Sequence, residues 1–151
     1  MTDLEQPICV NAALRRATRR MGQLYDDAMA PLGIKGTQFS LLYRIQSLEN
    51  PSLRMLATDM VMDISALGHT LKPLTRDGLI KLIQDPADKR AKRVHLTAKG
   101  AAIVKTGIVL WRKAHKNFET LFGAAKTAQL RQMLESISMQ DFADRFTEAL
   151  R

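Results

Sequence analysis

The sequence predicts a mainly α-helical protein with a small β-wing, that is, a winged helix-turn-helix plus terminal dimerisation helices. Three observations support this fold class: two short amphipathic helices with a tight turn between them, a basic hairpin directly after them, and long apolar helices at both ends of the chain. The first two features follow the order found in a module that places one helix in the major groove of DNA. We expect the DNA-binding region to span 49–96, and 1–48 and 97–151 to form a helical dimerisation region within one intertwined domain.

The first helix of the motif is predicted to begin after Ser52, which follows a proline and is a good N-cap. Its apolar side chains recur three and four positions apart on one face: Leu53, Leu56, Ala57 and Met60. Val61 and Met62 are expected to form the turn. Asp63 is placed to cap the second helix, because its carboxylate can accept hydrogen bonds from the first N–H groups.

The second helix is predicted to have two unlike faces. The apolar face comprises Ile64, Leu67, Leu71 and Leu74. The opposite face carries hydrogen-bonding side chains suited to base edges and phosphates: Ser65, His69, Lys72 and Arg76. Gly78 is expected just past the end of the helix. Pro73 is expected to bend it, because proline removes the hydrogen bond to the carbonyl of His69.

A basic hairpin is predicted next, with strands at 79–83 and 92–96 and a turn at 85–88. Four of the five residues 89–93 are basic. A charge run alone is typical of a solvated face, and paired amphipathic helices occur in many small domains. Together, in this order and at this spacing, the two patterns indicate DNA binding.

Several short motifs occur together in this segment: Ser52-Leu53, Leu56-Ala57, Leu71-Lys72-Pro73-Leu74, Asp77-Gly78-Leu79-Ile80, Asp85-Pro86-Ala87-Asp88-Lys89-Arg90 with Arg93, and Leu96-Thr97-Ala98-Lys99-Gly100. With these motifs the chain resembles the MarR (multiple antibiotic resistance regulator) family of bacterial transcription factors. Residues 25–42 fit the family pattern as well, whereas Pro73 inside the recognition helix departs from it. The resemblance implies a dimer formed by the terminal helices, with Arg90 of the wing in the minor groove, oriented by Asp88.

We therefore expect three kinds of DNA contact. The major groove is approached by Ser65, Ala66, His69, Thr70 and Lys72. The wing pair Asp88 and Arg90 serves the minor groove, and Arg54, Lys89 and Arg93 contact phosphates. The expected DNA-binding residues are Arg54, Ser65, Ala66, His69, Thr70, Lys72, Arg76, Asp88, Lys89, Arg90 and Arg93.

Composition favours the same partner. The net charge is +8 and the pI is near 10.0, so a polyanion such as double-stranded DNA is the natural ligand. No apolar run approaches the ~20 residues of a membrane helix, the N-terminus lacks a signal-peptide layout, and one cysteine allows no intrachain disulfide. These features predict a cytoplasmic protein without a membrane partner. The three histidines fall on three predicted elements, with no metal-ligand spacing, so no enzyme activity, metal or cofactor is expected.

The flanks predict the oligomer. Helices are expected at 8–30, 37–48 and 97–122, with a last helix from about 126. Gly107 is expected to mark a bend in the helix at 97–122. The terminal helices are too apolar for the small helix-turn-helix core to cover, so a partner subunit is expected to bury them. A two-fold dimer also spaces two recognition helices about one DNA turn apart, roughly 34 Å, which matches an inverted-repeat operator.

A pocket for a small-molecule effector is predicted between the dimer helices and the helix-turn-helix, lined by Met21, Tyr25, Phe39 and Tyr43. An apolar lining with two phenol hydroxyls suits an aromatic or acyl ligand, although the same residues also fit an ordinary core. The predicted function is a repressor released by such a ligand.

Three other functions stay open: a redox-sensing regulator acting through Cys9, an unregulated architectural DNA-binding protein, and an adaptor that makes only protein contacts. The hydroperoxide-sensing branch of the family would place its cysteine at Asn11, so Cys9 is expected to be a partly buried structural thiol.

Overall fold

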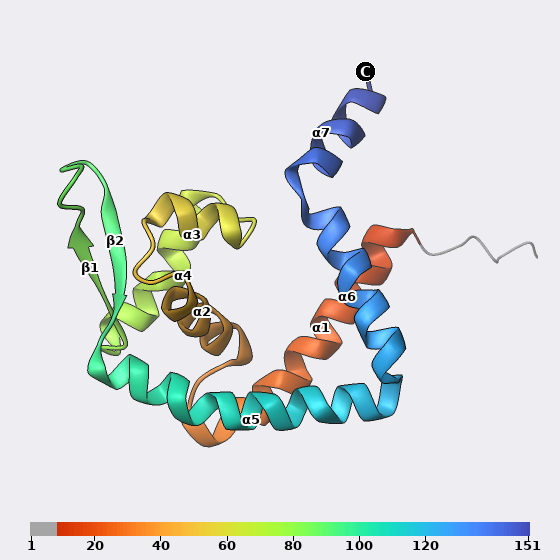
Figure 1. The fold of residues 1–151 in the computed structure, drawn as a ribbon, viewed down its shortest axis with the longest axis horizontal. Coiled ribbons are helices and arrows are strands. Elements are labelled where there is room, and N and C mark those ends of the chain that lie inside the picture. The colour runs from red at the N-terminus through yellow and green to blue at the C-terminus, as the bar shows by residue number, and fades with distance from the viewer. Residues whose placement is uncertain (1–8) are drawn as a thin grey trace, which may run out of the picture.

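A computed structural model describes residues 9–151 of the 151-residue chain. One long helix, α5 (Ala98–Phe122), joins two groups of elements (Figure 1). The wing, α2, α3 and α4 lie toward one end of α5, α1 crosses α5 near its middle, and α6 begins at the other end. The fold is mostly helical with one two-stranded antiparallel sheet, which confirms the predicted fold class.

The N-terminal part of the described chain is a helical hairpin. Helix α1 covers Val10–Met29 and passes into a 3₁₀ turn, Ala30–Leu32, and α2 covers Gly36–Ser47. The predicted helices at 8–30 and 37–48 are confirmed within one or two residues, except that residue 8 lies outside the described part. The backbone N–H of Gly36 donates to the carboxylate of Asp26 at 2.8 Å, which fastens the start of α2 to α1.

The helix-turn-helix consists of α3 (Leu53–Asp59) and α4 (Ile64–Arg76). Both predicted caps are present: Ser52 Oγ accepts from the N–H of Met55 at 3.1 Å, and the Asp63 carboxylate accepts from the N–H of Ala66 at 2.7 Å. The turn between the helices contains Val61 in the left-handed region, with φ of 52°. This conformation lets the N–H of Met62 reach the carbonyl of Ala57 at 2.9 Å.

The C-terminal end of α4 has the same geometry, built on a glycine. Gly78 has φ of 70°, and the N–H of Leu79 donates to the carbonyl of Leu74 at 2.9 Å. The helix runs through Pro73 to Arg76. Ile64 does not belong to the buried face as predicted, since it is 48% exposed in the first turn, ahead of the part of α4 that contacts the core.

The wing pairs β1 (Ile80–Gln84) with β2 (Lys92–Leu96), in a register that sets Ile80 opposite Leu96. The first strand begins one residue later than predicted. The chain ahead of α3 lies against the same hairpin, because the N–H of Val94 donates to the carbonyl of Pro51 at 2.9 Å. The middle of the second wing strand is therefore fastened to the start of the helix-turn-helix.

The C-terminal region holds two helices where one was predicted. Helix α6 covers Ala124–Ser138 and α7 covers Gln140–Ala149, and Met139 between them has extended ψ of 147°. The expectation of a single last helix was wrong, and residues 126–150 contain no proline or glycine that would signal the break. In Figure 1, α7 extends away from the rest of the protein.

A single core unites the predicted DNA-binding and dimerisation regions. Its members come from α2, α3, α4, the wing and α5: Leu41, Leu42, Ile45, Leu56, Ala57, Leu67, Leu71, Leu74, Leu79, Ile80, Val94 and Val104. Gly107 lies next to this core, and a Cβ there would stand 2.4 Å from Phe39 Cε2. The glycine thus permits close packing of α5 on α2, which is a reason for its presence other than the bend expected from the sequence.

Candidate nucleic-acid interface

Helix α4 presents the predicted polar face to solvent. Leu67, Leu71 and Leu74 are buried beneath it. Ser65, His69, Lys72 and Arg76 are exposed, and Ala66 is partly exposed. Within residues 9–151 the side chains of Ser65, His69 and Lys72 make no hydrogen bond, so their polar groups are available to DNA.

Two further predicted contact residues have local partners. The hydroxyl of Thr70 donates to the carbonyl of Ala66 at 3.0 Å, so it is left as an acceptor. Arg76 pairs with Asp77 at 3.1 Å, but its side chain is 74% exposed. An exposed pair of this kind contributes little, and the guanidinium can leave Asp77 for a phosphate. Arg54 is exposed on α3.

The tip of the wing is shaped by Asp88. Its carboxylate accepts from the backbone N–H of Arg90 at 2.9 Å, and its carbonyl accepts from the N–H of Ala91 at 3.0 Å. Asp88 therefore orients Arg90 through the backbone turn. Gln84 closes the hairpin by donating to the carbonyl of Lys89 at 2.7 Å. Lys89 and Arg90 are both exposed.

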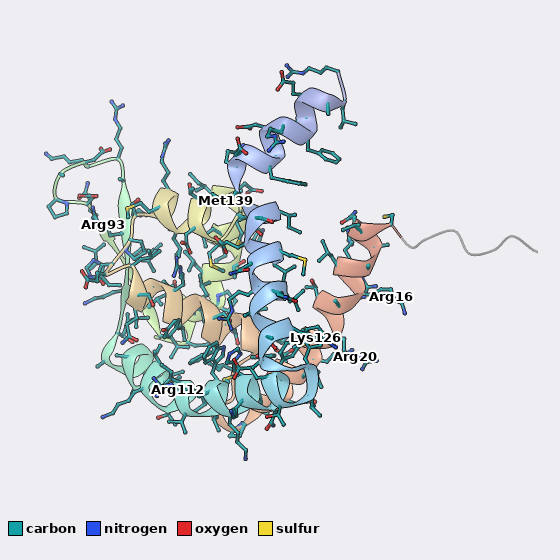
Figure 2. All side chains as sticks on the ribbon, turned by 45° about the vertical axis from the view of Figure 1, so that its right-hand side comes forward. Arg16, Arg20, Arg93, Arg112, Lys126 and Met139 are labelled. Atoms are coloured by element: carbon teal, nitrogen blue, oxygen red, sulfur yellow. The ribbon has the colours of Figure 1, made fainter. Side chains whose placement is uncertain are left out.

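Arg93, predicted to contact phosphates, has two partners within the protein. Its Nε donates to the carboxylate of Asp85 at 2.9 Å, and a terminal nitrogen donates to the carbonyl of Asn50 at 3.0 Å. The side chain, labelled in Figure 2, joins the turn end of the wing to the loop before α3. In this conformation Arg93 is a positioning residue, because two of its donors are occupied within the protein.

Asp85 was predicted only as part of the hairpin turn, and its role as the partner of Arg93 was not predicted. It is 8% exposed, and its carboxylate also accepts from the N–H of Ala87 at 2.9 Å. The hydrogen bond from Ala87, together with Arg93, lowers the pKa of Asp85 below the ordinary aspartate value. An aspartate followed by proline is a common turn-forming signal, but its pairing with Arg93 depends on the strand register.

The structure brings two of the four predicted effector residues to a cavity. Met21 and Tyr25 line a space of about 720 Å³ between α1 and α5, with Phe118 and Leu110 on the opposite wall. The same two residues border a second space of about 570 Å³ that reaches α6. Burial raises the pKa of Tyr25, so its phenol stays protonated and can donate a hydrogen bond.

The other two predicted effector residues lie elsewhere. Phe39 is buried in the core, and Tyr43 is half-exposed, stacked on Phe39 with ring centroids 6.3 Å apart. Neither borders the cavities. The basic side chains that do border them are Lys113 and Arg131.

Cys9 is exposed, in contrast to the partly buried thiol predicted. Its sulfur accepts from the N–H of Ala12 at 3.4 Å and so caps α1. Among residues 9–151 no group of His, Cys, Asp and Glu side chains is arranged to hold a metal ion. No helix in the same part of the chain is long and apolar enough to cross a membrane.

An exposed polar helix beside a basic hairpin, both fixed on one core, defines a winged helix-turn-helix DNA-binding protein. Residues 34–92 match the model of the MarR family. The solved structure of the transcriptional regulator MosR from M. tuberculosis in complex with DNA is similar, with 33% identity and a TM-score of 0.72, over 87% of this chain and 100% of that one. The chain belongs to the MarR family, whose members are transcriptional regulators and not enzymes.

Two other solved structures share the fold. A cysteine-to-serine mutant of MarR from E. coli with operator DNA gives a TM-score of 0.79 at 24% identity, covering 91% of this chain and 99% of that one. The transcriptional repressor CouR bound to a 23-mer DNA duplex gives a TM-score of 0.79 at 24% identity, covering 92% of this chain and 99% of that one. No curated protein sequence matches the chain significantly.

Proposed function

We propose that this MarR-family regulator binds an inverted-repeat DNA operator as a homodimer and acts as a repressor that a small-molecule ligand releases. The observation that supports operator recognition is the polar face of α4, where Ser65, His69 and Lys72 are exposed and make no side-chain hydrogen bond within residues 9–151. The wing supplies Arg90 beside it, ordered by the Asp88 turn. The DNA-bound structures of MosR, MarR and CouR agree with this use of the fold.

The DNA proposal is tested by fluorescence anisotropy on inverted repeats from the DNA flanking the gene. Affinity is expected to fall roughly a thousandfold between 50 and 200 mM salt, because bound phosphates release counterions. Arg90→Ala should weaken the free energy of DNA binding by on the order of 1–3 kcal/mol. It should also reduce the preference for A·T pairs under the wing, since a narrow minor groove attracts an inserted arginine.

His69→Ala should instead relax specificity at one or two major-groove positions. Arg112→Ala serves as the control, since Arg112 is exposed on α5, away from the wing (Figure 2). A salt slope near zero, or equal losses from all three variants on every sequence, would refute operator recognition.

The effector proposal rests on the two adjoining cavities that share Met21 and Tyr25. Their apolar walls and the protonated Tyr25 hydroxyl suit an aromatic or acyl ligand with a polar group. Such a ligand releases DNA only by favouring a spacing of the two recognition helices that does not fit the operator.

Aromatic acids and their thioesters provide the probes, in thermal-shift and operator-release assays. Tyr25→Phe should weaken binding of a hit, whereas Tyr43→Phe, which removes the same hydroxyl outside the cavities, should not. A hit that responds to Tyr43 and Phe39 variants alone would place the ligand in the originally predicted pocket.

Redox control through Cys9 is the second candidate, favoured by the exposure of its thiol. A reactive cysteine must be accessible to the oxidant and must form a thiolate. The exposure of Cys9 meets the first requirement. An unregulated architectural role predicts no response to either ligand or oxidant.

A further inference from the structure

A hollow separates the recognition helix α4 from the first wing strand, β1. It has a volume of about 410 Å³, and its lining comes from α3, α4 and β1 and includes Leu53, Gly68, Lys72, Thr75, Arg76 and Leu82. Alternation along β1 places Leu82 on the same face as the buried Ile80, and α4 contacts this strand. Leu82 is nevertheless 39% exposed, so α4 does not close over it.

The α4 side of the hollow is basic. Lys72 and Arg76 lie one turn apart and are both exposed. Arg76 pairs with Asp77 at 3.1 Å, an exposed contact that contributes little. The hydroxyl of Thr75 donates to the carbonyl of Leu71 at 3.1 Å, so it is not free to donate to an anion. The two cationic side chains are therefore the donors that this side offers.

The other side of the hollow is apolar. It is formed by Leu53, at the start of α3, and by Leu82. Among residues 9–151, no acidic side chain lines the hollow. Cationic donors beside apolar side chains suit a ligand that alternates negative charge with apolar surface, as the phosphates and deoxyribose rings of a DNA strand do.

Gly68 keeps the hollow open. It lies in the interior of α4, where glycine is less favourable than alanine. A Cβ at position 68 would meet no atom within 4 Å, so packing within the described chain does not require glycine there. Gly107 differs in this respect, because a Cβ there would collide with Phe39. The missing side chain at Gly68 instead leaves the backbone of α4 open to a molecule that approaches from outside.

DNA bound as proposed above would pass over this hollow. A sugar–phosphate strand separates the major groove of B-DNA from the adjacent minor groove. When α4 occupies the major groove and Arg90 the adjacent minor groove, that strand runs between α4 and the wing. The hollow lies between the same two elements.

We propose that the hollow between α4 and β1 seats the sugar–phosphate strand that separates the two grooves. Its phosphates are bound by Lys72 and Arg76, and a deoxyribose packs against Gly68 and Leu82. This inference rests on the proposed operator binding. It gives Gly68 and Leu82 a role in DNA binding, and it assigns Lys72 to the DNA backbone rather than to base edges.

The first test fills the hollow. Gly68→Ala and Gly68→Leu are measured by fluorescence anisotropy on an inverted-repeat duplex from the DNA flanking the gene and on an unrelated duplex of the same length. Affinity should fall roughly tenfold for the alanine variant and further for the leucine variant, because the added atoms overlap the bound strand. Both duplexes should lose affinity by similar factors, since the backbone carries no direct sequence information. The urea midpoint of Gly68→Ala should meanwhile rise.

Ala102→Leu is the matched control for the filled hollow. It adds a large apolar side chain at an exposed position of α5 that does not line the hollow. Both DNA affinities should stay at the wild-type level. Circular dichroism confirms that each variant keeps its helices.

The second test removes phosphate charges one at a time. A methylphosphonate group replaces each phosphate of the inverted-repeat duplex in turn. At one or two positions in each half-site, the replacement should weaken wild-type binding roughly tenfold, because a charge-assisted hydrogen bond is lost. The same replacements should have little effect on a variant with Lys72→Gln and Arg76→Gln, which already lacks the cationic donors.

Several results would overturn the proposal. Wild-type affinity of Gly68→Leu for both duplexes would show that the strand does not enter the hollow, and loss of release by benzoate in that variant would assign the hollow to a small ligand. A loss confined to the inverted repeat would show that the hollow meets bases. A phosphate scan that gives the same losses with and without Lys72 and Arg76 would exclude them as the phosphate donors. A wild-type chain that binds neither duplex would contradict the proposed function itself, and this inference with it.

Discussion

Val61 is a β-branched residue in a conformation that usually requires glycine. It occupies the left-handed position after α3 with φ of 52°, the position that Gly78 occupies after α4 with φ of 70°. In both places the next N–H bonds back to the last turn of the helix at 2.9 Å. We predict that Val61→Gly stabilises the protein, whereas Gly78→Ala destabilises it.

The magnitude follows from the backbone. The left-handed conformation destabilises the folded state by roughly 1–2 kcal/mol for an L-residue. Glycine avoids this strain, but its larger loss of backbone entropy on folding costs roughly 0.5–1 kcal/mol relative to alanine. Val61 is 69% exposed, so its replacement removes little apolar contact. The net gain from Val61→Gly is about 0.5–1 kcal/mol, which raises the melting temperature by roughly 1–4 °C in a chain of this size. A Cβ at position 78 meets no atom within 4 Å, so Gly78→Ala isolates the backbone cost of about 1 kcal/mol.

Urea denaturation at one fixed protein concentration measures both variants, because dimerisation would otherwise shift the midpoint. The midpoint should move in opposite directions for the two variants while the slope with urea stays constant. Val61→Asn, which tolerates the left-handed region better than valine, should also stabilise. A loss of stability from Val61→Gly as large as that from Gly78→Ala would refute the prediction, since the contacts of Val61 would then outweigh its backbone strain.

Three further predictions concern the wing, the α2–α5 contact and the thiol. Because the hydrogen bond from Ala87 and the Arg93 pair lower the folded-state pKa of Asp85, its stabilising effect is present above the ordinary value of 3.8 and is lost as the pH falls through the lowered pKa. In urea titrations, the difference in free energy of unfolding between wild type and Asp85→Asn should narrow only below about pH 4. A difference that widens there would contradict this prediction. Gly107→Ala should lower the free energy of unfolding by roughly 1–3 kcal/mol, because the added methyl group overpacks against Phe39. Gly68→Ala, at an open helical position, should raise it by about 1 kcal/mol. Similar urea midpoints for the two variants would count against the close contact of α5 with α2. Cys9→Ser should keep the α1 cap and operator binding, and organic hydroperoxide should not release the wild-type protein from DNA. Release of the wild type but not of the mutant in the anisotropy assay would establish the redox alternative.

The features predictable from the sequence are those set by neighbouring residues. Ser52 and Asp63 are predictable as caps because a short polar side chain needs only the N–H group three residues ahead. The strands of the wing followed from alternation and a proline-containing turn. These local rules placed the elements and the polar face of α4.

Features set by distant contacts were missed. The wing motif includes Arg93, but its partners, Asp85 and the carbonyl of Asn50, become visible only when the hairpin register and the loop before α3 are known. Ile64 fits the helical period but lies beyond the core. The break at Met139 has no sequence signal, since its backbone change arises without proline or glycine.

The shared core limits how the DNA-reading segment can be exchanged between proteins. Leu41, Leu42 and Ile45 of α2 and Val104 of α5 pack in the same cluster as the leucines of α4, although all four lie outside residues 49–96. A chimera that transplanted only 49–96 into a relative would set these side chains against an unmatched surface. Specificity is therefore more readily retargeted by changing exposed positions of α4 one at a time, or by moving α2 through the first turns of α5 as one block.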